Sequence, residues 1–239
     1  MMSFYRNKPI LFAVLWIVFY VVTAGTLRSG GDDSPYMTIG LIVIACALLL
    51  FVHKNGLAQE FGLTSWPNNA KQMLYFVPVW IITTGNLWTG IDPHYQGLNL
   101  ACAIVSMALV GVVEELVFRG LLFRGMLKEG SATSAIVVSA LTFGIGHIVN
   151  LLNGQDTLET LVQIVFAVAI GLMFTLVYYK GGSLLPVIVA HSLIDVASIF
   201  SGRSATALFD AIATAAIIVI ALAYSVYLWR LDTPKEAVG

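Results

Sequence analysis

Long apolar runs, separated by short polar or glycine-containing connections, divide the chain into eight segments. A helix needs about 20 mostly apolar residues to cross the hydrocarbon core of a bilayer, and most of these segments approach that length. Strands of a membrane barrel would alternate apolar and polar residues, and these runs do not alternate. The pattern predicts transmembrane helices at Ile10–Thr26, Tyr36–Val52, Met73–Trp88, Leu98–Phe118, Ser134–Leu152, Leu158–Tyr179, Leu184–Phe200 and Ala205–Trp229.

The composition supports the same class. Hydrophobic residues make up 59% of the 239 residues and charged residues 10%, with a mean hydropathy of +0.89, whereas soluble domains carry roughly 25% charged residues. A soluble enzyme and a disordered chain are therefore excluded, and a net charge of −1 offers little to a nucleic acid. We expect one all-α transmembrane domain over residues 1–239, with its core motifs within 111–199, a lipid bilayer as partner and no nucleic acid.

Lysine and arginine are distributed unevenly between the two sides of the predicted spans. Cytoplasmic loops of membrane proteins carry an excess of these residues. Only Arg28 and Arg203 fall on the minority side, so we expect a multi-pass protein of the cell membrane with both termini in the cytoplasm. The majority are Arg6, Lys8, Lys54, Lys71, Arg119, Arg124, Lys128, Lys180, Arg230 and Lys235.

The longest polar connection, Lys54–Lys71, contains Leu57, Phe61 and Trp66 among polar residues. This mixture is typical of a short amphipathic piece that lies on a membrane surface. We therefore expect the connection to lie on the cytoplasmic face of the membrane.

Acidic and basic residues inside the predicted spans are few. A charge in the bilayer costs about 2.5–3.5 kcal/mol on insertion scales, so such residues usually face the protein interior and serve a function. Glu115 and Arg119 are four residues apart in the fourth span, where they share a helix face and can pair. Glu114 is rotated by about 100° from Glu115 and has no local cation. The adjacent acids can divide into a general base and a structural carboxylate, or they can be the charged end of a long helix.

The fifth span contributes His147. Gly144 and Gly146 precede this histidine, and Gly111 precedes the acidic pair of the fourth span. Glycines permit close approach between membrane helices, so we expect these residues to bring the fourth and fifth helices together around a shared water. Alone, His147 could simply bond a carbonyl group.

The seventh span contributes His191 and Asp195, four residues apart on one helix face. An acid beside an imidazole can fix the orientation of the ring. The alternative is an ion pair that holds helices together.

Three spans thus bring Glu114, His147 and His191 to overlapping depths. A glutamate with two histidines can activate a water, with or without a metal. The sequence contains no His-Glu-x-x-His motif, which excludes the arrangement of the zincin class of zinc proteases. Buried acids and histidines also form proton relays, so a small proton-coupled transporter is an alternative, although no inverted repeat is evident.

These residues resemble the motifs of the CAAX protease and bacteriocin-processing family of intramembrane proteases, also called the Abi family. The family pattern is Glu-Glu-x-x-x-Arg, then Phe-x-x-x-His, then His-x-x-x-Asn or Asp, on three transmembrane helices. The resemblance implies eight helices that enclose an intramembrane catalytic cavity. In the order of the pattern, the chain supplies Glu114, Glu115, Arg119, Phe143, His147, His191 and Asp195.

The resemblance also implies roles: Glu114 and His147 activate a water, and His191 and Asp195 stabilise the oxyanion. It makes Glu115 with Arg119 a structural ion pair; Phe143 and Gly146 are expected to support the site. An ionised Asp195 would repel an oxyanion, so Asp195 could instead orient His191, be protonated or bind a metal. Glu114, His147 and His191 could also hold a zinc ion with one open position, or act as a metal-free, glutamate-dependent protease.

We therefore expect an intramembrane endopeptidase that acts on a peptide or a membrane protein. Family substrates range from prenylated CAAX peptides to bacteriocin precursors. The distribution of positive charge fits a bacterial plasma membrane, which favours peptide processing or bacteriocin self-immunity. A non-catalytic immunity or partner-binding protein is the main alternative.

Overall fold

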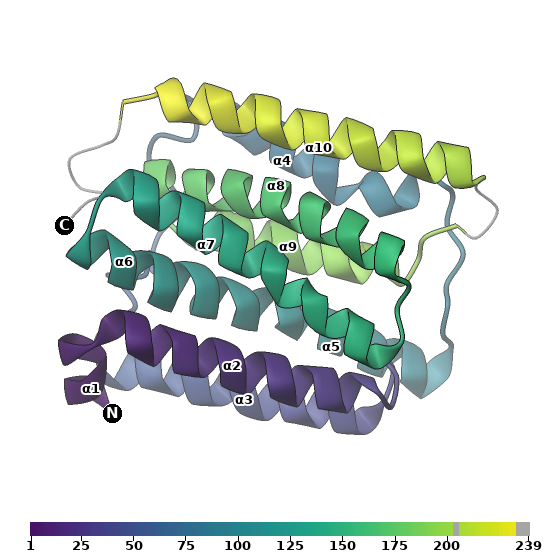
Figure 1. The fold of residues 1–239 in the computed structure, drawn as a ribbon, viewed down its shortest axis with the longest axis horizontal. Coiled ribbons are helices and arrows are strands. Elements are labelled where there is room, and N and C mark those ends of the chain that lie inside the picture. Colours follow the sequence, from purple (N-terminus) through teal and green to yellow (C-terminus); the bar gives the residue numbers. More distant parts are fainter. Residues whose placement is uncertain (203–205, 233–239) are drawn as a thin grey trace.

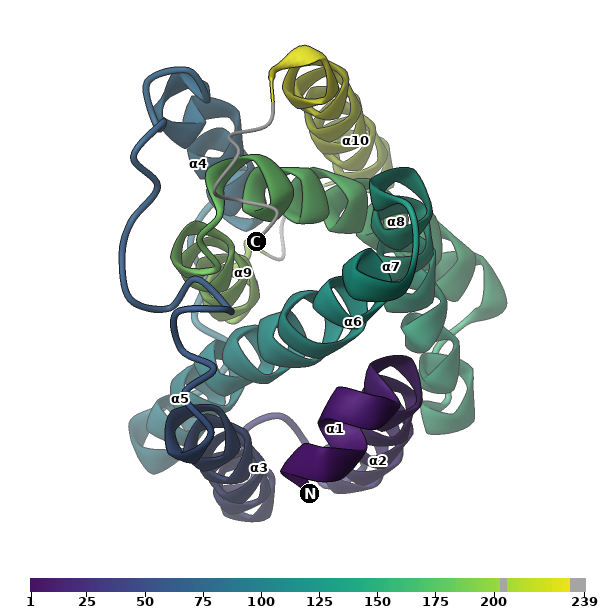
Figure 2. The same ribbon diagram turned by 90° about the vertical axis from the view of Figure 1, so that its left-hand side faces the viewer.

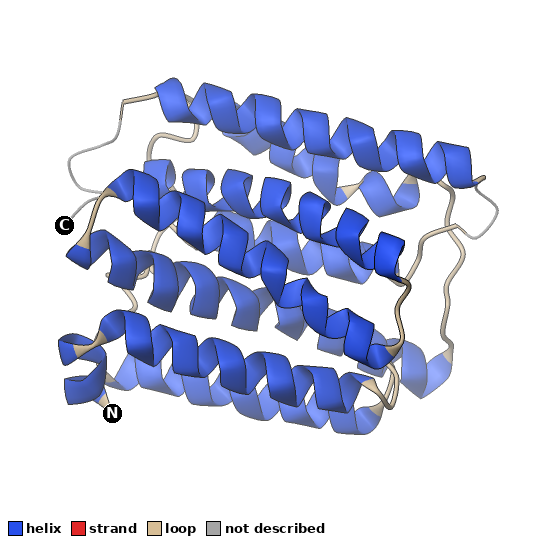
Figure 3. Ribbon diagram, in the orientation of Figure 1, coloured by secondary structure: helices blue, strands red, loops and turns tan. Residues whose placement is uncertain are grey.

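The structure is a computed structural model that describes residues 1–202 and 206–232, and in this part of the chain all regular elements are helices, apart from one isolated bridge between Ile91 and Ser201 (Figure 3). Arg203, Lys235 and the start of the eighth predicted span lie outside the described residues. The elements are α1 (Met2–Asn7), α2 (Pro9–Arg28), α3 (Pro35–Lys54), η1 (Leu74–Phe76), α4 (Val77–Thr83), η2 (Gly85–Leu87), α5 (Gly97–Glu114), η3 (Glu115–Phe123), α6 (Arg124–Glu129), α7 (Ala132–Gly146), η4 (His147–Asn153), α8 (Thr157–Gly181), α9 (Leu185–Ser198) and α10 (Ala207–Arg230).

Within the described residues, six helices are long and apolar enough to span a membrane, and two shorter apolar helices, Leu74–Thr83 and Leu185–Ser198, complete the set. These eight helices correspond to the eight predicted segments. The protein is therefore a polytopic, all-α membrane protein, as the hydrophobic pattern predicts.

The helices form a layered bundle. The pair α2 and α3 lies on one side, α4 and α10 lie on the opposite side, and the continuous segment α5–η3–α6 runs between them (Figures 1 and 2). In the middle of the bundle, α5 packs against α3 and α9, α7 packs against α8, and α2 packs against η3. The central segment therefore contacts the α2–α3 side directly, whereas α8 and α9 lie between it and the α4–α10 side, and the acidic pair lies on this segment.

The fourth predicted span is longer than expected and changes its helical form. It continues to Glu129, and η3 (Glu115–Phe123) is a π-helix in which every residue is buried. π-Helical turns are rare and occur mostly at functional sites. This one begins at Glu115, so the two adjacent acids sit where the α-helical backbone becomes wider.

The third predicted span is broken, contrary to the expectation of one crossing helix. Leu74, Tyr75 and Phe76 have φ values of 53°, 50° and 60°, in the left-handed region that residues with a Cβ rarely adopt. Side chains donate to the backbone around this turn: the Tyr224 hydroxyl to the Met73 carbonyl at 2.6 Å, and the Trp80 indole to the Tyr75 carbonyl at 3.1 Å. Tertiary contacts therefore fix a turn that the apolar sequence does not signal.

The polar connection between α3 and η1 packs against the bundle, and its position on the cytoplasmic face of the membrane stays a prediction. Its backbone forms turns, and Leu57 and Phe61 are buried in the bundle. A Cβ on Gly120 would lie 2.9 Å from the Phe61 ring, so the glycine in η3 makes room for this aromatic side chain. Hydrophobic side chains here point into the protein, while Trp66 is exposed.

One end of the bundle carries α1, the end of α3, α6 and the end of α10 (Figure 1). Glu60 joins two of these parts, because Lys128 pairs with its carboxylate at 2.6 Å and the Tyr5 hydroxyl donates to the same oxygen at 3.2 Å. Burial and the neighbouring Glu60 raise the pKa of Tyr5, which keeps this hydroxyl protonated. Arg119 was expected on the same side of the membrane as Lys128, but it lies fully buried inside the bundle.

Candidate active site

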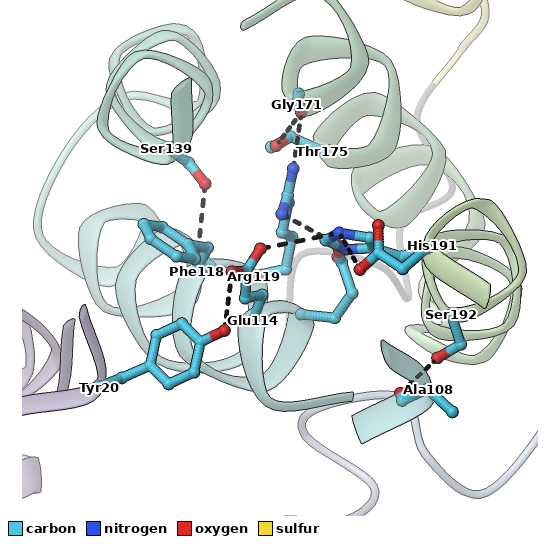
Figure 4. Close-up of polar contacts among 12 residues, drawn as sticks. Tyr20, Ala108, Glu114, Phe118, Arg119, Ser139, Gly171, Thr175, His191 and Ser192 are labelled. Carbon is cyan, nitrogen blue, oxygen red and sulfur yellow. Dashed lines mark hydrogen bonds and ion pairs between the residues drawn. The ribbon is translucent and has the colours of Figure 1, made fainter. Parts of the chain in front are cut away.

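Glu114, the last residue of α5, contacts polar groups from two other helices. Its Oε1 accepts a hydrogen bond of 2.8 Å from the Tyr20 hydroxyl on α2. Its Oε2 lies 3.6 Å from Nε2 of His191 on α9. Tyr20 and His191 approach the carboxylate from opposite sides (Figure 4), so both of its oxygens face a defined partner.

Glu115 forms the predicted pair with Arg119: Nη1 of Arg119 donates to Oε1 of Glu115 at 2.9 Å, and both side chains are fully buried. A second donor of Arg119, Nη2, bonds the Gly171 carbonyl at 3.2 Å, and the guanidinium lies 4.4 Å from the centre of the Phe143 ring. Such pairing is what makes a buried guanidinium tolerable. Phe143 thus supports the ion pair through its aromatic face.

Glu115 has a second partner besides Arg119, and this partner belongs to the site. The same Oε1 lies 2.8 Å from Nδ1 of His191. An ionised carboxylate only accepts hydrogen bonds, so Nδ1 carries the hydrogen and Nε2 points towards Glu114. The buried ion pair and His191 therefore form one connected network.

Asp195 lies beside His191 without a hydrogen bond to it, since its Oδ2 is 3.6 Å from Nε2. The hydrogen bond that orients the ring comes from Glu115 instead. The sequence suggested that Asp195, on the same helix as His191, could orient the ring. In the structure the acid that bonds the ring is Glu115, on another helix.

A cavity of about 60 Å³ lies between α2, the α5–η3 junction and the α7–η4 junction. Its lining includes Glu114, His147, Tyr20 and Gly146. A cavity needs about 10–15 Å³ of such space to hold a water, so this cavity is large enough for at least one. Among the described residues, the His147 ring contacts Phe143 edge-on but has no side-chain hydrogen bond, and the residue is only partly buried. Its ring nitrogens are therefore available to this space.

The cavity thus joins Glu114 with His147, while His191 and Asp195 border Glu114 from the other side. The four predicted residues come from α5, η4 and α9 and meet in one region of the bundle. In this arrangement Glu114 and His147 can hold a water between them, and His191 can supply a further hydrogen-bond donor nearby.

Gly111 and Gly144 do not bring the fourth and fifth helices together, so the prediction is wrong for these two glycines. A Cβ on Gly111 would lie 2.5 Å from the Ser192 nitrogen of α9, and one on Gly144 would lie 2.3 Å from a Val168 methyl of α8. A Cβ on Gly146 would meet only Phe118, at 3.9 Å. Glycine spacing indicates a close approach but not the neighbour, and Gly146 instead borders open space in the cavity.

Two residues that the sequence reasoning did not propose for the site also line the cavity: Tyr20 and Arg28, both on α2. Tyr20 stands in an unbroken apolar run, and tyrosine is common in membrane helices. No feature of the sequence distinguishes it. Arg28 was visible only as a minority cation in a loop.

The zinc alternative is not supported by the donor arrangement. In the part of the chain that the structure describes, no group of three or more histidine, cysteine, aspartate or glutamate side chains is placed to hold a metal ion. We therefore derive no step through a metal.

Comparison with known proteins gives one finding. Residues 96–197 match the family described as type II CAAX prenyl endopeptidase Rce1-like. The matched segment includes Glu114, His147, His191 and Asp195, whereas Tyr20 and Arg28 lie outside it. No curated protein and no solved structure gave a match.

Proposed function

Residues 96–197 form an Rce1-like domain of the type II CAAX prenyl endopeptidase family, and on that premise we propose that the protein is an intramembrane endopeptidase whose attacking water is activated by Glu114 and His147. The family is one of CAAX-type proteases, and the glutamate and histidines at its motif positions are present and buried or partly buried here.

The observation that carries the proposal is the cavity of about 60 Å³ that Glu114 and His147 share. A buried carboxylate and imidazole beside a space of water size can hold a water in a fixed orientation. Apolar side chains, among them Val110, Phe118 and Phe143, line much of the space, and such surroundings strengthen the polar interactions within it.

In the proposed reaction, Glu114 takes a proton from the water while His147 holds the water oxygen. The water oxygen then bonds to the carbonyl carbon of the substrate, and the carbonyl oxygen becomes an oxyanion. When the C–N bond breaks, Glu114 returns its proton to the leaving nitrogen. The products are a carboxylic acid and an amine, and the carboxylate of Glu114 is restored.

His191 is the proposed donor to the oxyanion. Nδ1 is fixed by Glu115, and Nε2 faces the space beside Glu114 and Asp195. A ring with a hydrogen on both nitrogens can donate to Glu115 at one side and to the oxyanion at the other. Glu115 thus acts as a positioning residue for His191.

Tyr20 is the proposed positioning residue for the general base. Its hydroxyl holds Oε1 of Glu114 at 2.8 Å, which leaves Oε2 to face the reacting groups. A fixed carboxylate is effective because a displacement of about 1 Å can cost about 10²-fold in rate.

The test is hydrolysis of a farnesylated CAAX-type peptide by the purified protein in detergent, followed by mass spectrometry. We expect cleavage by the parent protein and a loss of at least about 10²-fold in Glu114→Gln. Glu60→Gln is the matched control, because Glu60 lies in the polar connection and contacts Tyr5 and Lys128. Undiminished cleavage by Glu114→Gln would contradict the mechanism. No cleavage by the parent protein would contradict the proposed function.

Detergent also removes any gradient, so cleavage there separates a protease from a transporter or a purely partner-binding immunity protein. We further propose that the substrates are small peptides or membrane proteins, in peptide processing or bacteriocin self-immunity, and that both termini are cytoplasmic. The peptide that accumulates in cells carrying Glu114→Ala, identified by mass spectrometry, tests the substrate class.

A further inference from the structure

Arg28 is the only lysine or arginine among the described residues that line the cavity with Glu114. It is the last residue of α2, and its side chain is 41% exposed. Arg28 also lies near enough to Asp195 and His147 for electrostatic interaction through space. A cation therefore stands at one end of the proposed reaction site, where a ligand from outside can reach it.

The guanidinium is only partly occupied by the protein. Nε and Nη2 of Arg28 donate to the two carboxylate oxygens of Asp32 at 2.7 Å and 3.4 Å. A guanidinium has five N–H donors, so three are left without a partner among the described residues. Arginine binds carboxylates through paired, charge-assisted hydrogen bonds, and the remaining donors suit a second carboxylate.

The distance to the reaction site sets the length of peptide that can join the two. Tyr20, which holds Glu114, and Arg28 are eight residues apart on α2, which corresponds to a rise of about 12 Å. An extended peptide covers about 3.3–3.6 Å per residue. About three residues therefore fit between the attacked bond and the guanidinium.

We propose that Arg28 binds the terminal carboxylate of the substrate. The inference rests on the proposed endopeptidase function and adds a residue that determines specificity. The side-chain carboxylate of an internal aspartate or glutamate offers the same chemistry, and the peptides below separate the two sources.

The opposing explanation is that the ion pair of Arg28 with Asp32 only stabilises the loop after α2. An exposed ion pair of this kind contributes little to stability. The two explanations differ in what Asp32→Asn does. If Arg28 binds substrate, loss of its competing carboxylate preserves or strengthens binding; if the pair is a staple, Asp32→Asn resembles Arg28→Gln.

The experiment uses the purified full chain in detergent and farnesylated peptides with three residues after the cysteine. One peptide has a free terminal carboxylate, one has a terminal amide, and one has a terminal amide with glutamate as its last residue. We expect the parent protein to prefer the free acid over the plain amide by about tenfold in kcat/KM, mainly through KM. Arg28→Gln should lose this preference, so that it cleaves the free acid and the plain amide with similar kcat/KM. A thermal unfolding temperature like that of the parent shows that the variant is folded. Asp32→Asn should keep or increase the preference.

Several outcomes overturn the inference. These are an Arg28→Gln variant that still prefers the free acid, an equal loss on acid and amide, or an Asp32→Asn variant that behaves like Arg28→Gln. A preference for the glutamate amide alone assigns the guanidinium to a side-chain carboxylate and refutes the terminal role. No cleavage of any peptide by the parent refutes the endopeptidase function itself, whereas cleavage without an acid preference refutes only the role of Arg28.

Discussion

Replacing Tyr20 with phenylalanine removes one oxygen atom from the site and leaves the ring in place. The hydroxyl donates to Oε1 of Glu114 at 2.8 Å, and Tyr20 is buried. The substitution therefore tests whether a residue outside the family-matched segment positions the proposed base.

Two effects oppose each other in Tyr20→Phe. A hydrogen bond to a charged group is worth about 1.5–3 kcal/mol. Without this hydrogen bond the Glu114 carboxylate is a stronger base. If the proton is half transferred in the transition state, about half of the lost hydrogen-bond energy lowers the barrier, which raises the rate roughly fivefold. The freed carboxylate also loses its orientation, and a shift of about 1 Å costs about 10²-fold. The positioning effect is larger, so we expect kcat to fall by about tenfold with KM unchanged.

The assay is peptide hydrolysis in detergent together with thermal unfolding, and Tyr224→Phe is the matched control. Tyr224 is also buried, and its hydroxyl donates to the Met73 carbonyl at 2.6 Å on the far side of the bundle. Each substitution leaves a buried acceptor without its donor, at about 1–3 kcal/mol, so both should lower the unfolding temperature. Only Tyr20→Phe should lower kcat.

A Tyr20→Phe protein with the parent kcat would refute the positioning argument. Equal losses of kcat in Tyr20→Phe and Tyr224→Phe would show that the loss reflects general destabilisation. A rise in KM alone would instead place the hydroxyl in substrate binding.

Two further predictions use neighbouring positions. Gly144→Ala should destabilise the protein by about 1–3 kcal/mol, because the added Cβ would lie 2.3 Å from Val168 and 3.0 Å from the Ile164 carbonyl. Gly146→Ala should fold normally but lower kcat, because it places a methyl group in the cavity. Thermal unfolding and kcat of both variants check this, and equal unfolding temperatures would contradict it. Asp195→Asn should keep kcat within about threefold of the parent or raise it, because Glu115 rather than Asp195 orients the neighbouring histidine; a loss of 10²-fold or more, the scale of a lost oxyanion donor, would show that the carboxylate itself is required.

Much of the fold follows from the sequence because lipid demands long apolar segments, and each predicted segment contains a helix. The break at Leu74–Phe76 could not be predicted, since hydroxyl groups of α10 fix it from far along the chain. The end of the fourth span was misplaced because Arg119 and Arg124 look like a polar boundary. Both are in fact buried: Arg119 pairs with Glu115, and Arg124 donates to the Tyr178 hydroxyl at 2.8 Å.

The candidate site was found through the cost of charge in a membrane, which singles out Glu114, Glu115 and His191. Spacing on one helix identified the pair of Glu115 with Arg119. It could not identify the bond between Glu115 and His191, which joins residues 76 positions apart. Tyr20 escaped notice because an uncharged phenol in an apolar run has no cost that marks it.

The two short helices α4 and α9 have a consequence for the bilayer itself. With 14 residues, α9 is about 21 Å long, whereas the hydrocarbon core is about 30 Å thick. Both helices expose apolar side chains, among them Ile81, Val189 and Leu193. Such hydrophobic mismatch is relieved by local thinning of the bilayer. His191 lies on α9, so a bilayer that thins to match this helix would be thinnest beside the proposed site.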